Sequence, residues 1–187
     1  MDIALEAPVA AARTLLRDAC KATHARLDAR LSQVNFDDGR DYAEMLSRMS
    51  APLSALESGL TAGIAPVLFS NWAARLRAHA LRRDLALLDA PFLARQGAAI
   101  DSEAEAFGVL YVLEGSRLGG QVLAQMARSS RDPGVQAATR YLGHGARSGL
   151  WRSFLERLEA SPAVRDDIKR AKRAAVGAFE AFEAAFA

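Results

Sequence analysis

Apolar residues recur every three or four positions along most of the chain, which is the spacing of one face of an α-helix. In the first such stretch, over residues 8–34, Leu16, Cys20, Leu27 and Leu31 fall on one face. Alanine, leucine and arginine are abundant, runs of β-branched residues are scarce, and no segment alternates apolar and polar residues as a strand does. The pattern therefore predicts an all-α protein.

Turn and capping residues divide the rest of the pattern. The segments 35–40, 132–134 and 143–149 read as turns or loops. Between them the pattern predicts six further helices. The first three run through Tyr42 to Leu56, loosening at Gly59 and Gly63, over 71–88, and from Asp101 or Ser102 to about 126. The last three are a short helix that ends near Tyr141, one over 150–158, and one from Ser161–Pro162 nearly to Phe186. We find no internal repeat or low-complexity linker, so we expect one domain over 1–187, with 1–8 as a flexible N-terminus. The expected architecture is a bundle of about six to eight helices.

Composition narrows the class of protein. Of 187 residues, 51% are hydrophobic and 25% are charged, which argues against intrinsic disorder. The longest apolar run, 106–113, is far shorter than the roughly 18 residues of a membrane span, and Asp2 and Glu6 precede the first arginine, unlike the basic start of a signal peptide. One cysteine excludes a disulfide framework, and a net charge of +2 is too small to predict a nucleic-acid groove. We expect a cytosolic protein that binds neither membrane nor nucleic acid.

Three histidines are the strongest candidates for acid–base or metal chemistry. His79 lies among four nearby arginines and His144 lies between two glycines, so both are expected at the surface. Neither has a glutamate three positions earlier, which excludes the signature of carboxylate-bridged di-iron bundles. The sequence also has no nucleophile elbow of the kind that serine hydrolases use.

His24 has a different setting. Arg17, Lys21, His24 and Asp28 are spaced to share one helix face, beside the apolar stripe that contains Cys20. One imidazole therefore stands next to two cations at the margin of a core. Two interpretations remain open: a ligand for a metal, or a core histidine whose hydrogen bonds are satisfied. The cysteine is read as a small buried hydrophobe, with a thiolate ligand as the alternative.

The segment 107–123 has helical periodicity but contains four glycines. Each interior glycine costs roughly 1 kcal/mol relative to alanine, so together they cost about 4 kcal/mol, a large share of a domain's stability of about 5–15 kcal/mol. Gly115 and Gly119 are four positions apart and leave one face of the helix bare. This face either packs closely on another helix or receives a flat, bulky ligand against a backbone that must bend.

Taken together, these segments resemble the heme oxygenase family. Thr23–His24 with Asp28 one turn later is similar to its proximal helix, and the stretch 115–123, GSRLGGQVL, is similar to its distal helix. A third match runs from Leu150 through the residues that follow Pro162. The three segments have the family's order and separation over 15–186. The sequence of 111–116 is most similar to that of bacterial members that make biliverdin, including those that accompany phytochromes.

The resemblance implies roles for particular residues. His24 would be the axial ligand of the heme iron through Nε2, with a carboxylate or water near Nδ1. Arg17 and Lys21 match basic positions that face the heme propionates, and Arg152 matches a third. Asp28 lies one helical turn from the histidine, so its carboxylate is a candidate partner of the ring.

On the distal side, Gly115 and Gly119 would let the backbone approach the oxygen bound opposite the imidazole, and Gly120 belongs to the same heme-binding stretch. Ser116 occupies the position where animal-type members carry a carboxylate that organises water. A hydroxyl can hold water but supplies no such charge, so the proton network is expected to differ. In the final helix, Phe179 and Phe182 either form pocket wall or belong to the ordinary core.

The implied activity is the oxidative cleavage of heme, which serves as both cofactor and substrate. Molecular oxygen attacks a meso carbon of the ring, and the products are biliverdin, carbon monoxide and ferrous iron. The chain has no recognisable flavin or nicotinamide fingerprint, so electrons are expected from a separate donor protein or reductant, and a bacterial phytochrome is a candidate recipient of biliverdin. Two alternatives remain: a non-catalytic heme carrier or sensor on the same fold, and a non-heme protein that uses the same helical scaffold.

Overall fold

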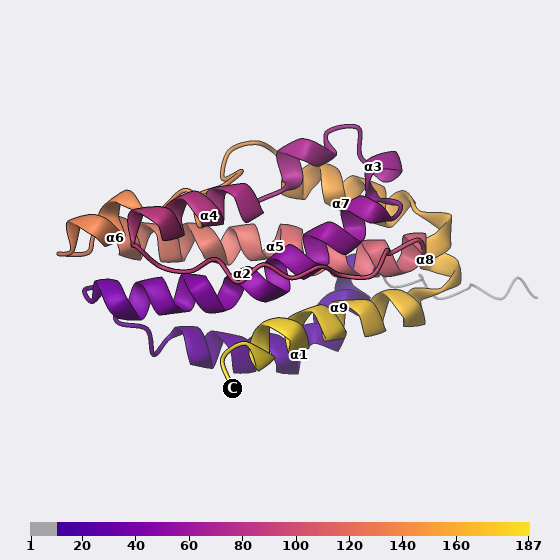
Figure 1. Cartoon of the computed structure of the whole chain (residues 1–187). Helices are drawn as coiled ribbons and strands as arrows, with labels where there is room; N and C mark the ends of the chain where they lie inside the picture. The colour runs from indigo at the N-terminus through magenta and orange to yellow at the C-terminus, as the bar shows by residue number, and fades with distance from the viewer. Residues whose placement is uncertain (1–10) are drawn as a thin grey trace, which may run out of the picture.

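A computed structural model describes residues 11–187 and shows a bundle of helices (Figure 1). The expected N-terminal tail 1–8 and the first residues of the expected first helix lie outside the described residues. Within 11–187 the regular elements are α1 (Ala12–Leu31), α2 (Gly39–Ala62), α3 (Ala65–Leu68), the 3₁₀ helix η1 (Trp72–Arg75), α4 (Ala78–Leu87), α5 (Glu103–Arg128), α6 (Pro133–Ala137), α7 (Leu150–Ala160), α8 (Pro162–Asp166) and α9 (Ile168–Ala184). The all-α class is confirmed. None of these helices is long and apolar enough to span a membrane.

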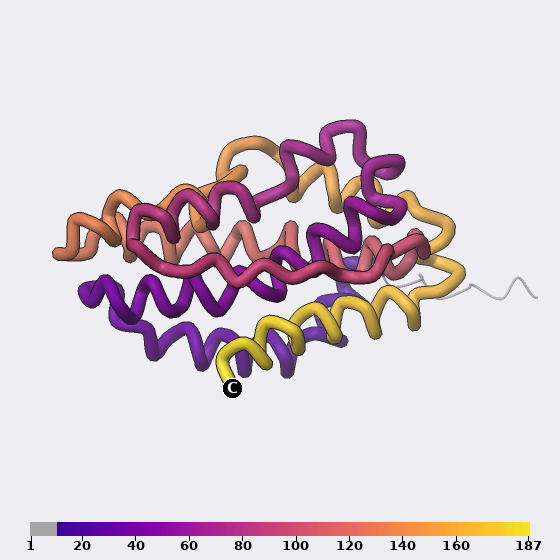
Figure 2. The backbone as a smooth tube through the Cα atoms, in the orientation of Figure 1, coloured from indigo at the N-terminus to yellow at the C-terminus, as the bar shows by residue number. Residues whose placement is uncertain are grey.

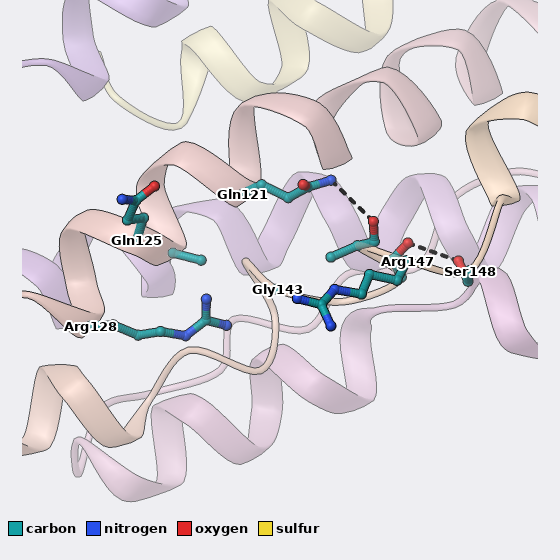
Figure 3. A pocket seen from close by; sticks show the side chains of 9 residues that line it. Gln121, Gln125, Arg128, Gly143, Arg147 and Ser148 are labelled. Atoms are coloured by element: carbon teal, nitrogen blue, oxygen red, sulfur yellow. Dashed lines mark hydrogen bonds between the residues drawn. The ribbon is translucent and has the colours of Figure 1, made fainter.

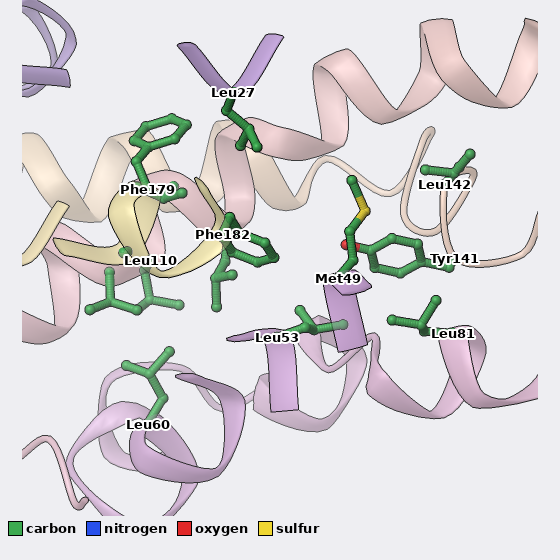
Figure 4. Packing of buried hydrophobic residues seen from close by; sticks show 14 of the residues in the cluster. Leu27, Met49, Leu53, Leu60, Leu81, Leu110, Tyr141, Leu142, Phe179 and Phe182 are labelled. Carbon is green, nitrogen blue, oxygen red and sulfur yellow. The ribbon is translucent and has the colours of Figure 1, made fainter. Parts of the chain in front are cut away.

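The four long helices α1, α2, α5 and α9 run along the molecule, and α9 packs against both α1 and α5 (Figures 1 and 2). Apolar side chains from these helices fill the space between them, Leu27, Leu53, Leu110 and Phe182 among them (Figure 4). Direct contact between α1 and α5 is sparse within the described residues. Parts of α1 and of α5 are therefore left uncovered by each other and can contact solvent or a ligand.

The position of α1 is fixed at both ends by charged groups. At its start, the Glu159 carboxylate of α7 accepts hydrogen bonds from the backbone N–H groups of Ala12 and Arg13, at 2.9 Å each. A carboxylate at this place also opposes the positive end of the helix dipole. Further along, Arg26 forms a two-pronged ion pair with Glu183 of α9, with contacts of 2.6 and 2.9 Å. The helix is thus attached to α7 and α9 without help from α5.

The segment expected to form one helix over 71–88 is divided. Its first part forms η1, Leu76 is extended, and α4 begins at Ala78. The reason is the buried carboxylate of Glu57 on α2, which accepts hydrogen bonds from the backbone N–H groups of Arg77 and Ala78 at 2.7 and 3.0 Å. A carboxylate that takes up the free N–H groups of a first turn starts a helix there.

Two other expected helices are also shorter than predicted. The helix expected to end near Tyr141 stops at Ala137, and the Asp84 carboxylate accepts from the backbone N–H groups of Arg140 and Tyr141 instead. The final helix is broken at Asp167, whose side chain accepts from the backbone N–H of Arg170 and caps α9. The break at Asp167 and the short helix α3, which the sequence pattern did not predict, raise the number of α-helices within 11–187 to nine, against the six to eight expected.

Residues 90–102 form an extended segment that lies along α2 (Figure 2). Three serines of α2, spaced four residues apart, accept hydrogen bonds of 2.8–2.9 Å from its backbone: Ser50 from Leu93, Ser54 from Arg95 and Ser58 from Gly97. A hydroxyl can donate and accept at once, and each serine also donates to a carbonyl of its own helix. The segment therefore has hydrogen-bond partners without belonging to a sheet.

Candidate functional site

A cleft of about 430 Å³ lies along the exposed face of α1, which we call the α1 cleft. It is lined by Arg17, Asp18, Lys21, His24, Ala25 and Asp28. The sequence predicted that four of these residues share a helix face, and the structure places all four at this cleft. The cleft combines one imidazole with two cations and two carboxylates.

The imidazole of His24 is accessible: 59% of its side chain is exposed. The ring of Phe179 on α9 packs beside it, with 5.2 Å between ring centroids. Its Nε2 lies 3.6 Å from Oδ2 of Asp28, which is too long for a hydrogen bond. The residue is therefore not a core histidine with satisfied hydrogen bonds, and Asp28 lies nearer Nε2 than the Nδ1 side where a carboxylate was expected.

The other site residues on this side have separate placements. Arg17 contacts Asp18 at 3.2 Å through an exposed pair, and Lys21 is exposed one turn later. Arg152 is exposed on α7, beside Trp151, and does not line the α1 cleft. Cys20 is buried, and burial raises the pKa of its thiol to about 11. A neutral thiol at this depth supports the interpretation as a small hydrophobe.

Helix α5 presents a second exposed surface, which we call the open face. A side chain placed on Gly119 would meet nothing within 4 Å, and one on Gly115 would meet only the ring of Trp151 at 3.6 Å. Helical spacing puts three large, exposed hydrophobic side chains on the same face: Leu118, Val122 and Met126. An apolar patch around bare backbone is typical of a ligand-binding surface.

The other two glycines of this segment serve packing. A side chain on Gly108 would collide with the carbonyl of Ala171 on α9, and one on Gly120 would lie 2.9 Å from the carbonyl of Leu142. Close packing thus explains Gly108 and Gly120. The structure directs Gly120 toward the loop that contains Leu142, whereas the sequence grouped it with the heme-binding glycines of the open face.

Ser116 is tied to a buried arginine that the sequence did not single out. Its hydroxyl donates to the carbonyl of Leu113 at 2.9 Å and accepts from Nη2 of Arg77, also at 2.9 Å. The proton of the hydroxyl is therefore used within the helix, and one lone pair remains. Burial lowers the pKa of Arg77, but an arginine stays charged in proteins, so a positive charge lies beneath this serine.

A cluster of buried charges lies on the side of α5 opposite the open face. Glu114 pairs with Arg75 at 3.2 Å and with Arg117 at 2.9 Å, and each of the three side chains is at most 3% exposed. Arg117 also donates to the backbone carbonyl of Arg75 at 2.7 Å. Burial lowers the pKa of Arg75, whereas the nearby carboxylate opposes this shift. The only sequence signal was the spacing of Glu114 and Arg117, three positions apart on one helix.

His144 is half-buried, which corrects the expectation of an exposed residue. Its Nδ1 lies 3.0 Å from Nη1 of Arg117, and the same arginine reaches its backbone carbonyl. Burial, followed by the charge of Arg117, lowers the pKa of His144 to about 4. The ring is therefore neutral near pH 7 and accepts at Nδ1, because arginine can only donate. Its neighbour His79, 5.5 Å away between ring centroids, is exposed as expected.

Within residues 11–187, no group of three or more His, Cys, Asp or Glu side chains is arranged to hold a metal ion. Heme needs fewer ligands from the protein, because the porphyrin supplies four nitrogens and one imidazole can complete the attachment. The accessible ring of His24 suits the iron, and the cations of the α1 cleft suit the propionates. The apolar open face of α5 suits the flat porphyrin ring. The residues present therefore fit heme.

Comparison with known proteins decides the family. The family model described as heme oxygenase matches residues 10–187. The chain belongs to the heme oxygenase family. A curated heme oxygenase of Xanthomonas campestris pv. campestris is 39% identical over 135 residues, which cover 70% of this chain and 81% of that protein. The crystal structure of the NO- and CO-bound heme oxygenase of Neisseria meningitidis has the same fold, with a TM-score of 0.78, 22% identity, and coverage of 95% of this chain and 91% of that one.

Membership of the heme oxygenase family confirms the function predicted from the sequence. The protein is a heme-degrading oxygenase, and heme is both its cofactor and its substrate. The fold class is confirmed by the structural match. The roles of individual residues, the similarity to phytochrome-associated members and the recipient of biliverdin stay predictions.

Proposed function

We propose that this heme oxygenase holds its substrate between the α1 cleft and the open face of α5, with His24 as the axial ligand of the iron. The observation that carries this proposal is the pairing of an accessible imidazole on α1 with a bare, apolar face on α5. Bound heme supplies both the iron that activates oxygen and the ring that is cleaved. A neutral imidazole suits this chemistry better than a thiolate, which favours cleavage of the O–O bond.

The charged residues of the α1 cleft orient the substrate. Arg17 and Lys21 are exposed cations within one helical turn of each other and are suited to the two propionates. Arg152, on the neighbouring α7, is our candidate for a third such contact. Phe179 holds one side of the imidazole by packing rather than by a hydrogen bond, so the ring keeps its exposed edge.

On the distal side, backbone and water replace the carboxylate of animal-type members. Gly115 and Gly119 leave room for a small ligand of the iron, and the hydrophobic residues of the open face exclude other water. The hydroxyl of Ser116 already donates its hydrogen bond to the carbonyl of Leu113, so it can only accept a hydrogen bond from a water, through its remaining lone pair. Ser116 therefore does not deliver a proton. The charge of Arg77 fixes this orientation of the hydroxyl.

Gly119→Leu tests the placement of the open face. Wild type supplied with hemin, a reductant and air should convert the Soret band into the absorption of biliverdin. The leucine fills the space above the ring, so we expect hemin to bind but biliverdin formation to fall about a hundredfold, since small displacements at a reacting centre have effects of this size.

Gly177→Leu on α9 is the matched control, because a side chain there also meets nothing within 4 Å. It should turn over like wild type. Equal rates for the two leucine variants would reject the placement of the distal face. Stoichiometric hemin binding by wild type without any biliverdin would instead favour the heme carrier or sensor.

We also infer that electrons come from a separate donor and that biliverdin passes to a bacterial phytochrome in the cytosol. The chain has no recognisable flavin or nicotinamide fingerprint, and residues 111–116 resemble phytochrome-associated members. Enzyme turning over in the presence of an apophytochrome should give the far-red absorption of the assembled receptor faster than the same amount of free biliverdin does. Equal assembly rates would show that the two proteins do not transfer the product directly.

A further inference from the structure

A second and larger cleft, of about 860 Å³, lies between the C-terminal half of α5 and the loop over residues 143–148 (Figure 3). It shares no lining residue with the α1 cleft. Its α5 residues Gln121, Gln125 and Arg128 are rotated around the helix from Val122 and Met126, which belong to the open face. The cleft is therefore separate from the α1 cleft and adjoins the open face of α5, since Gln125 follows Leu118 by seven residues.

Two arginines from different elements converge in this cleft. Arg128 extends from α5 and Arg147 from the loop, and their guanidinium groups point into the same space (Figure 3). Within residues 11–187, neither side chain forms an ion pair, and no Asp or Glu lines the cleft. Two adjacent cations without a carboxylate repel each other, and an oxyanion between them removes this repulsion.

The loop that carries Arg147 has its own hydrogen bonds, and Arg128 lies over the backbone of this loop. A side chain on Gly143 would lie 2.8 Å from Nη2 of Arg128, so the guanidinium lies close to the backbone of the loop at this glycine. Gln121 donates from Nε2 to the carbonyl of Ala146 at 3.5 Å and connects the loop to α5 at the rim. Within the loop, the hydroxyl of Ser148 donates to the carbonyl of Gly145 at 2.8 Å, and Gly145 has a φ of 72°, a conformation that suits glycine.

We propose that this cleft, which we call the arginine cleft, binds a small molecule with a doubly charged oxyanion group bridging Arg128 and Arg147. Planar guanidinium groups bind the oxygens of phosphoryl groups and of paired carboxylates, so these are the two chemical classes the site suits. The amide of Gln125 and the amide oxygen of Gln121 are available to an uncharged part of the same molecule. The volume lies within the range of clefts that take drug-sized ligands and exceeds what a single phosphate needs.

The test is calorimetric titration of the full chain loaded with hemin, with pyrophosphate in one arm and malonate in the other. Loading with hemin occupies the cations of the α1 cleft, so that they do not compete for the probes. We expect one molecule of probe per chain. Arg128→Gln and Arg147→Gln should each weaken binding about tenfold or more, because each removes charge-assisted hydrogen bonds.

Arg95→Gln is the matched control, since Arg95 is an exposed arginine of the extended segment along α2 and lies outside the arginine cleft. It should bind both probes like wild type. Gly143→Ala is a further variant that leaves both charges in place but displaces Arg128, and it should weaken binding by a smaller factor.

The two probes distinguish the ligand classes. Tighter binding of pyrophosphate assigns the site to phosphorylated molecules, and tighter binding of malonate assigns it to dicarboxylates. Two outcomes overturn the proposal: neither probe binds at millimolar concentration, or Arg95→Gln loses as much affinity as the variants within the arginine cleft. The second outcome would mean that the anions respond only to the overall charge of the protein.

Discussion

His24→Ala should lose the Soret band of a histidine-ligated heme and should form biliverdin more than about a hundredfold more slowly than wild type. Loss of groups that merely support a metal ligand costs 10–100-fold, and this change removes the ligand itself. Within residues 11–187, no second imidazole or thiolate lies at the α1 cleft to replace it. Cys20 is buried with a thiol pKa near 11, so it supplies no thiolate, and neither of the other two histidines lines the α1 cleft.

The measurement is a hemin titration followed by absorption, then turnover with a reductant under air. Free imidazole added to the alanine variant should restore much of the spectrum, because it can enter the cavity left by the side chain. His79→Ala is the control: this residue is an exposed histidine on α4, and its loss should leave both spectrum and turnover unchanged. An unaltered spectrum in His24→Ala would show that the iron is held elsewhere and would remove the basis of the proposed site.

The parts of the site that follow from local spacing could be predicted from the sequence. A helix repeats every 3.6 residues, so the grouping of Arg17, Lys21 and His24 on one face needs only the assumption that the segment is helical. The same holds for the bare strip formed by Gly115 and Gly119. The structure keeps both faces exposed, which periodicity by itself could not decide, because the same strip of glycines also suits close packing of helices.

The parts that depend on distant pairs could not be predicted. Arg75 and Arg77 lie in a strongly charged stretch that looks like a solvated surface, yet both are buried. Arg75 meets Glu114 about 40 positions later, and Arg77 donates its backbone N–H to Glu57, 20 positions earlier. The same distant carboxylate divides the expected helix over 71–88. Spacing within one segment contains no information about which carboxylate folds against it.

One side of α5 is the open face, and the opposite side carries buried charges. The buried charges stabilise a helix that the glycines of the open face destabilise. The glycines of the open face reduce the intrinsic stability of the helix by roughly 1 kcal/mol each relative to alanine. On the opposite side, Glu114 and Arg117 attach the same helical turns to Arg75 and to the loop at His144. Buried ion pairs hold a segment in one arrangement when every partner is satisfied, and no buried side-chain nitrogen or oxygen atom within 11–187 lacks a hydrogen-bond partner.

Glu114→Gln should therefore destabilise the fold by about 3–5 kcal/mol, the cost of leaving a buried charge without its partner. The amide keeps the shape of the side chain but not its charge, so Arg75 and Arg117 remain buried beside each other with no anion between them. Against a total of about 5–15 kcal/mol this is a large fraction, and the expected fall in Tm is on the order of 10 °C. Urea unfolding gives the free energy and a thermal scan gives the Tm, both without hemin, because a bound ligand adds stability of its own.

Glu44→Gln provides the comparison at the surface. It removes a carboxylate that pairs with Arg48 at 2.6 Å, so the chemical change is identical, but both side chains are substantially exposed. Water screens an exposed pair and solvates the arginine left behind, so the unfolding midpoint should barely move. If the two glutamine variants unfold at the same urea concentration, the buried charges do not hold α5 in place. The helix would then have to be kept straight by its apolar contacts with α9, and its glycines would be free to bend without any constraint from Glu114.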